Sequence, residues 1–390
     1  MLFAHFSDCH VGGWKEDKLS SLNMQCFKEA VKLCLVKNVD FVLIPGDLFN
    51  SALPQIDFIK EVTSELKTLK DRNIPVYMVA GSHDYSPSGK TMLDVLEKAG
   101  LIENVMKIND EKLGFIVDKK TGVKIAGLHG KRGGLEIKDY ETLDFSSIEN
   151  EEGYKVFLFH TAIEEFKPKG LENMPGTTAS SLPKGFNYYA GGHVHYIFQK
   201  EFEKGHLTFP GALFPNNFKE LEEWKYGGVY LVSETNLEYV PIKMKEVVNV
   251  RVDVTNLSPE EVSERIIERI KYLDVKDKLV TLRITGEING KVSDINFQEI
   301  LRNLEDAYFV LRNTAKLTSK VIHEFDMKSG SVEEIENEIL KEVESEMFDL
   351  AFTKLLIETL DKEKDEGEKV ADFEKRILSE AIKVLKIEDI

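Results

Sequence analysis

Short apolar runs alternate with longer amphipathic stretches along the first half of the chain. Runs of this length that end at glycine or aspartate predict buried strands. The stretches 27–35 and 58–69 instead have apolar residues at helical spacing and predict helices that cover a sheet. The apolar runs occupy residues 2–6, 41–44, 76–80 and 156–159. This alternation predicts an α/β fold.

The region 246–320 repeats the alternation on a smaller scale. Residues 248–254 alternate like a strand, and Ser258, Pro259 and Glu261 form the start of a helix with a capping box. A strand, a helix and a last strand are then predicted at 279–284, 297–304 and 308–311. The region therefore predicts a small α+β domain of βαβαβ order.

The last part of the chain, 321–390, is helical in pattern and acidic. Apolar residues recur at a spacing of four from Ile335 to Met347, and a second amphipathic helix carries Phe373 and Leu385. Two such helices at a chain end either pack on the chain's own body or bind a partner protein. We expect three parts, at 1–245, 246–320 and 321–390.

Composition bounds the class of protein. The chain has 390 residues, 42% of them apolar, which is enough for a large core. It has no apolar run of membrane-spanning length and begins directly with a strand, so we expect no membrane segment, no signal peptide and a cytoplasmic location. The three cysteines do not form a disulfide framework.

The net charge of −17 is unusual for a protein that binds nucleic acid. Much of it lies in the tail, since residues 321–390 carry 10 Lys and Arg against 21 Asp and Glu, whereas residues 1–250 carry 29 against 35. The Lys131–Arg132 turn can meet a phosphate backbone or simply be solvated. Strong DNA binding by the chain alone is not expected.

Five short motifs of carboxylate and imidazole residues follow predicted strands. Hydrolysis of a phosphodiester needs a hydroxide near neutral pH and positive charge on the phosphoryl oxygens, which two cations about 3.5–4 Å apart supply. Each motif alone is more often a turn or a buried polar group, but five in order predict a two-metal phosphoesterase site. The motifs are Asp8-Cys9-His10, Gly46-Asp47, Gly81-Ser82-His83-Asp84, His160-Thr161 and Gly192-His193-Val194-His195.

Strand alternation is expected to aim the paired ligands at one place. In Asp8-x-His10 and in His193-x-His195, side chains two residues apart point to the same face of a strand. Cys9 then points to the opposite face, so we expect it to pack in the core.

These motifs resemble the calcineurin-like metallophosphoesterases, whose pattern is Asp-x-His, Gly-Asp, Gly-Asn-His-Asp or Glu, His and Gly-His-x-His. The stretches 46–50 and 209–232 are similar to the nuclease subunit of the double-strand-break-repair nuclease–ATPase complex, which the bacterial SbcD exonuclease subunit resembles. The resemblance covers about the first 245 residues through motifs. It implies a two-sheet metallophosphoesterase sandwich flanked by helices, a DNA-end capping domain and a helical tail.

The resemblance also implies the roles of the motif residues. One metal is held by Asp8, His10, Asp47 and His195. The second metal takes Asp47, His160 and His193, with Asp47 bridging. His83 is the catalytic group beside the scissile phosphate, unless it only supports its loop, and Asp84 orients that loop.

The sequence departs from the family pattern at two positions. Ser82 replaces a metal-binding asparagine, and a hydroxyl is a shorter and poorer neutral ligand, so we expect a second metal held weakly or through water. Asn50 stands where many relatives have a histidine that helps cleavage. We therefore expect these departures to affect exonuclease efficiency more than metal binding.

The resemblance implies a manganese-dependent DNA exonuclease and endonuclease acting on DNA ends, single strands and hairpins in double-strand-break repair. The implied partners are a coiled-coil ATPase subunit, bound by the C-terminal helices, and a second copy of the chain, bound through 19–35 and 57–66. In 246–320, Arg302, Arg312, Lys316 and Lys320 either contact DNA or are solvated. The alternatives are a small-molecule phosphodiesterase or phosphatase, and a weakened nuclease that acts mainly as a DNA-end-binding scaffold.

Overall fold

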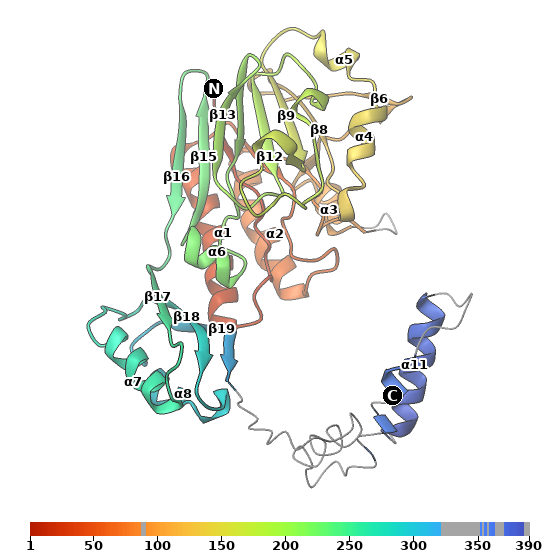
Figure 1. Cartoon of the computed structure of the whole chain (residues 1–390). Helices are drawn as coiled ribbons and strands as arrows, with labels where there is room; N and C mark the ends of the chain where they lie inside the picture. The colour runs from red at the N-terminus through yellow and green to blue at the C-terminus, as the bar shows by residue number, and fades with distance from the viewer. Residues whose placement is uncertain (87–90, 321–351, 353–354, 357–358, 363–369, 386–390) are drawn as a thin grey trace. The chain divides into compact units, whose positions relative to one another are not determined.

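The computed structural model describes residues 1–86, 91–320, 352, 355–356, 359–362 and 370–385 (Figure 1). Its contacts group the chain into two units, Met1–Val321 and Ile322–Ile390. The predicted boundary between residues 245 and 246 falls inside the first unit. The division into three functional parts stays a prediction.

Two six-stranded sheets form the body of the first unit. The first sheet has the order β16-β15-β1-β2-β3-β4 and the second has the order β13-β14-β12-β9-β8-β7. Strands β1, β2, β3 and β4 run parallel to one another, as do β8, β9, β12 and β14. The first sheet comprises β1 (Leu2–His5), β2 (Phe41–Pro45), β3 (Val76–Val79), β4 (Glu103–Asn104), β15 (Gly227–Ser233) and β16 (Leu237–Ile242). The second comprises β7 (Ile116–Val117), β8 (Lys124–Leu128), β9 (Lys155–His160), β12 (Tyr188–Gly192), β13 (Phe198–Phe202) and β14 (Gly205–Phe209).

The facing sides of the two sheets form one apolar core. Phe3 of β1 stacks on Phe41 of β2 at 4.8 Å between ring centroids and meets Tyr188 of the opposite sheet at 5.2 Å. The next residue along β1, Ala4, points to the outer side, because side chains alternate across a strand. Each sheet therefore has two buried faces, which explains why its strands read as continuous apolar runs.

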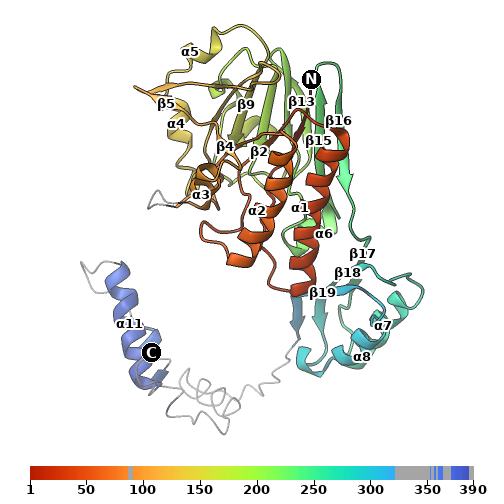
Figure 2. The same cartoon turned by 180° about the vertical axis from the view of Figure 1, so that it is seen from behind.

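Helices cover the outer faces of the sandwich. α1 (Asp17–Lys37) and α2 (Ile56–Asp71) cover the first sheet and lie in front of it in Figure 2. α1 begins ten residues before the predicted segment 27–35, since Leu19 and Leu22 continue its buried face, and α2 extends two residues beyond 58–69 at each end. α4 (Ile137–Thr142) and α5 (Ser146–Glu149) pack on the second sheet. The predicted two-sheet α/β sandwich flanked by helices is confirmed.

A small parallel sheet follows the sandwich, with the order β17-β18-β19. Its helix α7 starts with the predicted capping box of Ser258 and Glu261. β19 reaches Ser319, well beyond the predicted 308–311, because it is an edge strand whose later residues are polar and largely exposed. Among these residues, the guanidinium of Arg312 lies 3.9 Å from the centre of the Phe297 ring. The elements are β17 (Val247–Asp253), α7 (Pro259–Ile270), β18 (Leu279–Ile288), α8 (Phe297–Arg302) and β19 (Phe309–Ser319).

The tail is described only in part. α11 (Val370–Val384) matches the second predicted tail helix, whereas the first, with Ile335 and Met347, lies outside the described residues. Within the described parts of the chain, no helix has the length and apolar character needed to cross a membrane. The remaining elements are α3 (Met92–Lys98), α6 (Phe218–Glu223), β5 (Ile108–Asn109), β6 (Lys112–Leu113), β10 (Ala162–Ile163), β11 (Gly176–Thr177), and short 3-10 helices at Arg132–Gly134, Glu164–Phe166, Ala179–Ser181 and Val292–Asp294.

Candidate metal centre

The five motifs lie at or just past the ends of β1, β2, β3, β9 and β12, which are parallel strands within their sheets. Polar side chains gather at the carboxyl ends of such strands because the loops there leave the sheet together. Asp8, His10, Asp47 and His160 are all buried, with at most 2% of each residue exposed. The structure therefore brings residues separated by up to 187 positions, from 8 to 195, into one cluster.

The predicted strand alternation at the paired ligands is wrong. β1 ends at His5, so Asp8 and His10 lie in the loop beyond it, with left-handed φ angles of 50° and 42°. His193 also lies past the end of β12 and has a φ of 87°. The loop backbone, rather than the pleat of a strand, turns these side chains toward the cluster. Cys9, between two of them, is in the core as predicted.

Asp8, His10 and His195 form one candidate metal site, with one ligand atom of each within 4.8 Å of the others. The Nε2 atoms of His10 and His195 are only 3.0 Å apart. His195 Nε2 is also 3.8 Å from Asp8 Oδ1. Two imidazole nitrogens at this separation are close enough for one cation to bind both, since zinc–nitrogen bonds are about 2.0–2.1 Å long.

Asp47 lies between this group and a second one. With Asp8 and His160 it forms another set of ligand atoms within 4.8 Å. Its Oδ2 is 3.2 Å from His160 Nε2 and 3.7 Å from His10 Nε2. One carboxylate thus faces an imidazole of each group, which is the geometry that a bridging ligand requires.

Hydrogen bonds on the far side of each ring hold the imidazoles in place. His160 Nδ1 donates to the carbonyl of Pro45 over 2.8 Å, and His195 Nδ1 donates to Glu220 Oε1 over 2.9 Å. A histidine that donates from Nδ1 presents the lone pair of Nε2 to a metal. Both rings are therefore set as Nε2 ligands.

The charges of the cluster fit a cation. Burial raises the pKa of Asp8, whereas for Asp47 the opposing effect of burial is outweighed by His160 and its other histidine neighbours, which hold its pKa well below its usual range. Burial also opposes the charged form of His160, but Asp47 raises its pKa to about 10. His160 Nε2 is buried and has no hydrogen bond of good geometry. A cation can satisfy this nitrogen and both carboxylates together.

Two glycines let the loops approach this closely. A Cβ on Gly81 would lie 2.2 Å from Asp47 Oδ1, and a Cβ on Gly46 would lie 2.2 Å from His160 Nδ1. Gly46 also has a φ of 93°, which side chains rarely allow. The glycine in each of the two motifs is therefore required by the contact between their loops.

Residues 1–196 match the family described as calcineurin-like phosphoesterase. The chain belongs to this family. Its members' chemistry implies divalent metal ions, and the carboxylate and imidazole groups described above fit them. The predicted resemblance to the calcineurin-like metallophosphoesterases is confirmed.

The similarity of this phosphoesterase to individual relatives extends well beyond residues 1–196. A protein of Archaeoglobus fulgidus named DNA double-strand break repair protein Mre11 is 25% identical over 371 residues, covering 84% of this chain and 80% of the relative. Proteins of the same name from Thermoplasma acidophilum and Methanocaldococcus jannaschii are 28% and 29% identical, and cover 78% and 70% of this chain. These alignments cover 81% and 74% of the two relatives, respectively.

His193 occupies a different place in the phosphoesterase from the other predicted ligands. Its backbone N–H donates to both carboxylate oxygens of Asp8, at 3.0 and 3.2 Å. Its ring lies 5.1 Å from the His160 ring, centroid to centroid, and burial lowers its pKa to about 3. Its ring nitrogens are not within the three sets of converging ligand atoms found among the described residues. As the structure stands, His193 holds Asp8 through its backbone.

His83 and Asp84 of the phosphoesterase differ sharply in surroundings. His83 donates its backbone N–H to Asp47 Oδ1 over 2.7 Å, and its Nδ1 lies 2.8 Å from the carbonyl oxygen of Asn50. Asp84 accepts backbone N–H groups of Leu48, Phe49 and Gly81. The His83 ring is thus fixed beside the cluster, while the Asp84 carboxylate ties the loop that carries it to the loop after β2.

Glu220 is a site residue that the sequence motifs do not reveal. It lies 25 positions from His195, on α6, and also accepts the backbone N–H of Asn216 and the amide of Asn217. The Asn217-x-x-Glu220 spacing is a recognisable helix start, with Asn217 as the N-cap. The pairing with His195 is a long-range contact, so only the three-dimensional structure identifies it.

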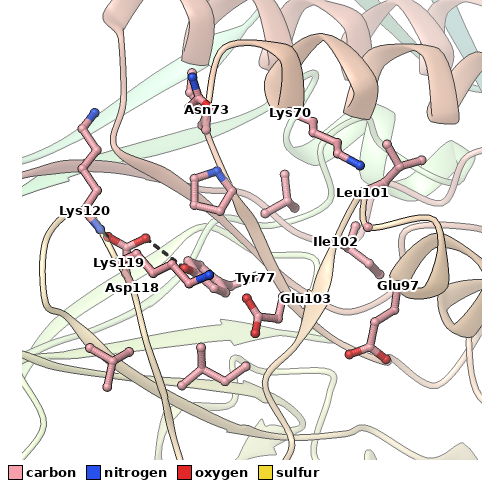
Figure 3. A pocket seen from close by; sticks show the side chains of 16 residues that line it. Lys70, Asn73, Tyr77, Glu97, Leu101, Ile102, Glu103, Asp118, Lys119 and Lys120 are labelled. Carbon is pink, nitrogen blue, oxygen red and sulfur yellow. Dashed lines mark hydrogen bonds between the residues drawn. The ribbon is translucent and has the colours of Figure 1, made fainter.

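A cavity of 940 Å³ lies elsewhere, at the start of β3 (Figure 3). Its walls include Lys70, Glu97 and Glu103, and its floor includes Tyr77, whose hydroxyl donates to Asp118 over 2.9 Å. The phosphoesterase cluster lies past the opposite end of the same strand, at Ser82 and His83. This cavity contributes no residue to the metal centre.

Ser82 places its hydroxyl 3.4 Å from Asp47 Oδ2, close to the second group of ligands. Replacing it by asparagine adds a carbonyl oxygen that reaches further. We expect Ser82→Asn to raise the affinity of the weaker manganese site by roughly tenfold, the lower end of the effect of supporting groups on metal affinity. Calorimetric titration with manganese measures this, and Ser64→Asn, an exposed position on α2, is the matched control. Equal affinities in Ser82→Asn and wild type would contradict the assignment.

Proposed function

We propose that this chain is a metal-dependent DNA nuclease of double-strand-break repair that hydrolyses phosphodiester bonds with two divalent cations, preferentially manganese. The observation that carries the proposal is the convergence of Asp8, His10, Asp47, His160 and His195 in two adjoining groups, in a chain similar to Mre11 proteins over most of its length. A mixed set of imidazole and carboxylate ligands suits manganese, iron or zinc, and the preference for manganese rests on the resemblance to the metallophosphoesterase nucleases.

The proposed ligand set follows the two groups. Asp8, His10, Asp47 and His195 hold one cation, and Asp47, His160, His193 and Ser82 hold the other. His193 joins the second group by turning its ring, which already lies against His160. When bound, the cations polarise the phosphoryl oxygens and supply hydroxide near neutral pH.

His83 acts on the leaving oxygen in this proposal. Its Nδ1–H donates to the Asn50 carbonyl, so the protonated ring presents Nε2–H away from that anchor. An imidazolium fixed in this way donates a proton to the departing sugar oxygen. Asp84 keeps the loop in register and does not touch the substrate.

Arg132 is the basic residue best placed for a substrate phosphate. Lys131 forms an ion pair with Asp139 at 2.6 Å, whereas Arg132 donates from Nε to the carbonyl of Ser82 over 3.3 Å. The guanidinium is exposed, and it has no carboxylate partner among the described residues. The two Nη groups of Arg132 can therefore donate hydrogen bonds to a phosphate beside His83.

The proposal is tested by incubating purified protein and manganese with linear duplex DNA, single-stranded DNA and bis-nitrophenyl phosphate. Cutting of DNA that stops on chelation supports a nuclease. Hydrolysis of the small diester without cutting of DNA would instead support a small-molecule phosphodiesterase. Binding of DNA ends with neither activity would support the scaffold reading, which the poor ligand Ser82 favours.

The proposed assembly places an ATPase partner on the C-terminal helices. The described helix α11 keeps an amphipathic sequence, with Leu378 62% exposed and Ile382 39% exposed. Deletion of 331–390 is expected to abolish binding of the coiled-coil ATPase and to leave manganese-dependent hydrolysis of bis-nitrophenyl phosphate unchanged. Pull-down with the ATPase measures the first effect, and retained binding would overturn the assignment. The homodimer through α1 and α2 stays a prediction.

A further inference from the structure

The short helix α6 carries two buried carboxylates that serve different parts of the molecule. Glu220 is 8% exposed and binds the candidate ligand His195, as described above. Glu222 is 5% exposed and binds the small parallel sheet of β17, β18 and β19. Since both lie on one helix of six residues, the two contacts are separated by little more than half a turn.

The contact between Glu222 and the small sheet is extensive. Arg283 of β18 donates to Glu222 Oε2 from Nε at 2.9 Å and from Nη2 at 2.7 Å. Arg251 of β17 donates to Oε1 at 3.2 Å, and the amide of Asn249 donates to the Glu222 carbonyl at 2.7 Å. The Arg283 guanidinium also lies 4.8 Å from the centre of the Phe218 ring. Two neighbouring strands therefore hold α6 through both side chain and backbone.

The contact between Glu220 and the metal centre leaves little freedom. Its Oε1 accepts from His195 Nδ1 and, at 2.6 Å, from the amide of Asn217, while Oε2 accepts from the Asn216 backbone at 2.7 Å. Leu221, between the two carboxylates, is fully buried in the core. A shift of α6 therefore moves the anchor of the His195 ring and changes where its Nε2 points.

We propose that α6 couples the small parallel sheet to the metal centre, so that the Glu222 contact with Arg283 and Arg251 sets the orientation of His195 and thereby the affinity for a cation. Glu222 and Arg283 are positioning residues that act through α6 and Glu220. Coupling is reciprocal, so cation binding also stabilises the contact between α6 and the sheet. The inference rests on the proposed role of His195 as a ligand.

The test is a calorimetric titration of the full-length chain with manganese in the absence of DNA. Glu220→Gln, which acts directly on His195, is expected to weaken the tighter site, the one without Ser82, by about 10–100-fold. Glu222→Ala and Arg283→Met are expected to weaken the same site by roughly fivefold, the lower end of coupling between separate sites. Lys278→Met is the matched control, since it removes ion pairs with Glu246 at 2.7 Å and Asp274 at 3.0 Å on the same small domain without touching α6.

Hydrogen exchange gives a second measurement, which would not change if Glu222 only stabilised the fold. Manganese is expected to slow amide exchange in 249–251 and 281–283 of the wild type, and this protection is expected to disappear in Glu222→Ala. Wild-type affinity and wild-type protection in Glu222→Ala, with only a lower melting temperature, would overturn the coupling.

The outcomes separate the coupling from the ligand assignment. If His195→Ala binds manganese as wild type does, the proposed ligand set fails, and the coupling fails with it. If His195→Ala weakens binding while Glu222→Ala does not, the ligand set stands and the coupling alone is wrong. Should Glu222→Ala fail to fold, Glu222→Gln keeps one acceptor oxygen and Arg283→Lys keeps the positive charge, so these variants carry the same comparison with a smaller expected loss.

Discussion

Asp47→Asn is expected to abolish manganese-dependent hydrolysis of both DNA and bis-nitrophenyl phosphate. The amide keeps an oxygen for the His83 backbone N–H, which lies 2.7 Å from Asp47 Oδ1, but it removes the negative charge that faces His160 and His10. A bridging ligand that no longer attracts two cations costs several kcal/mol of transition-state stabilisation. That corresponds to a loss of at least about 10³-fold in kcat/KM.

Asp118→Asn is the matched control for this prediction. Asp118 is also buried, 1% exposed, but it bonds Tyr77 and Thr121 in the wall of the remote cavity. Its replacement lowers the melting temperature without changing kcat/KM or the number of cations bound. Activity in Asp47→Asn within tenfold of wild type would exclude a bridging role for Asp47.

His83→Ala is expected to lower kcat by roughly 10²–10⁴-fold, the usual contribution of a positioned acid or base. The number of bound manganese ions should stay at two. His83, His10 and Asp47 also present ligand atoms within 4.8 Å of one another, so the structure leaves His83 close enough to ligate a cation. The stoichiometry of binding separates the two roles, because removal of a ligand, unlike removal of an acid, also weakens metal binding.

His206→Ala serves as the control for a lost imidazole. His206 belongs to β14 and lines a small surface pocket with Tyr154 and Asn187. Its loss leaves kcat unchanged. A His83→Ala protein that binds one manganese ion fewer than wild type, or that keeps the wild-type kcat, would refute the proposed role as acid.

The sequence predicted the strands and the identity of the clustered residues because both are local signals. The apolar run 41–44 by itself predicts a buried strand, and the Gly46-Asp47 that follows it predicts a polar strand end. The helices α1 and α2 were found for the same reason. Five such strand ends in one order then implied a shared site, and Asp8, His10, Asp47, His160 and His195 do converge.

Other features depend on contacts between distant segments, which no local pattern contains. Glu220 meets His195 across 25 positions, and Arg283 meets Glu222 across 61. The left-handed backbone at Asp8 and His10 is imposed by bonds to the loop after β2, such as His10 N–H to the Asp47 carbonyl at 3.0 Å. The alternation expected of a strand therefore predicted correctly that Asp8 and His10 face one site, although the loop backbone is what turns them there.

The order of the motifs along the chain has a consequence for protein synthesis. Asp8 is synthesised well before its partner His195, which follows it by 187 positions. The cluster also needs β9 and β12 of the second sheet, so no early folding intermediate can assemble it. A chain truncated before β12 therefore carries Asp8 and Asp47 without His195, and the metal centre forms only in a chain that has completed both sheets.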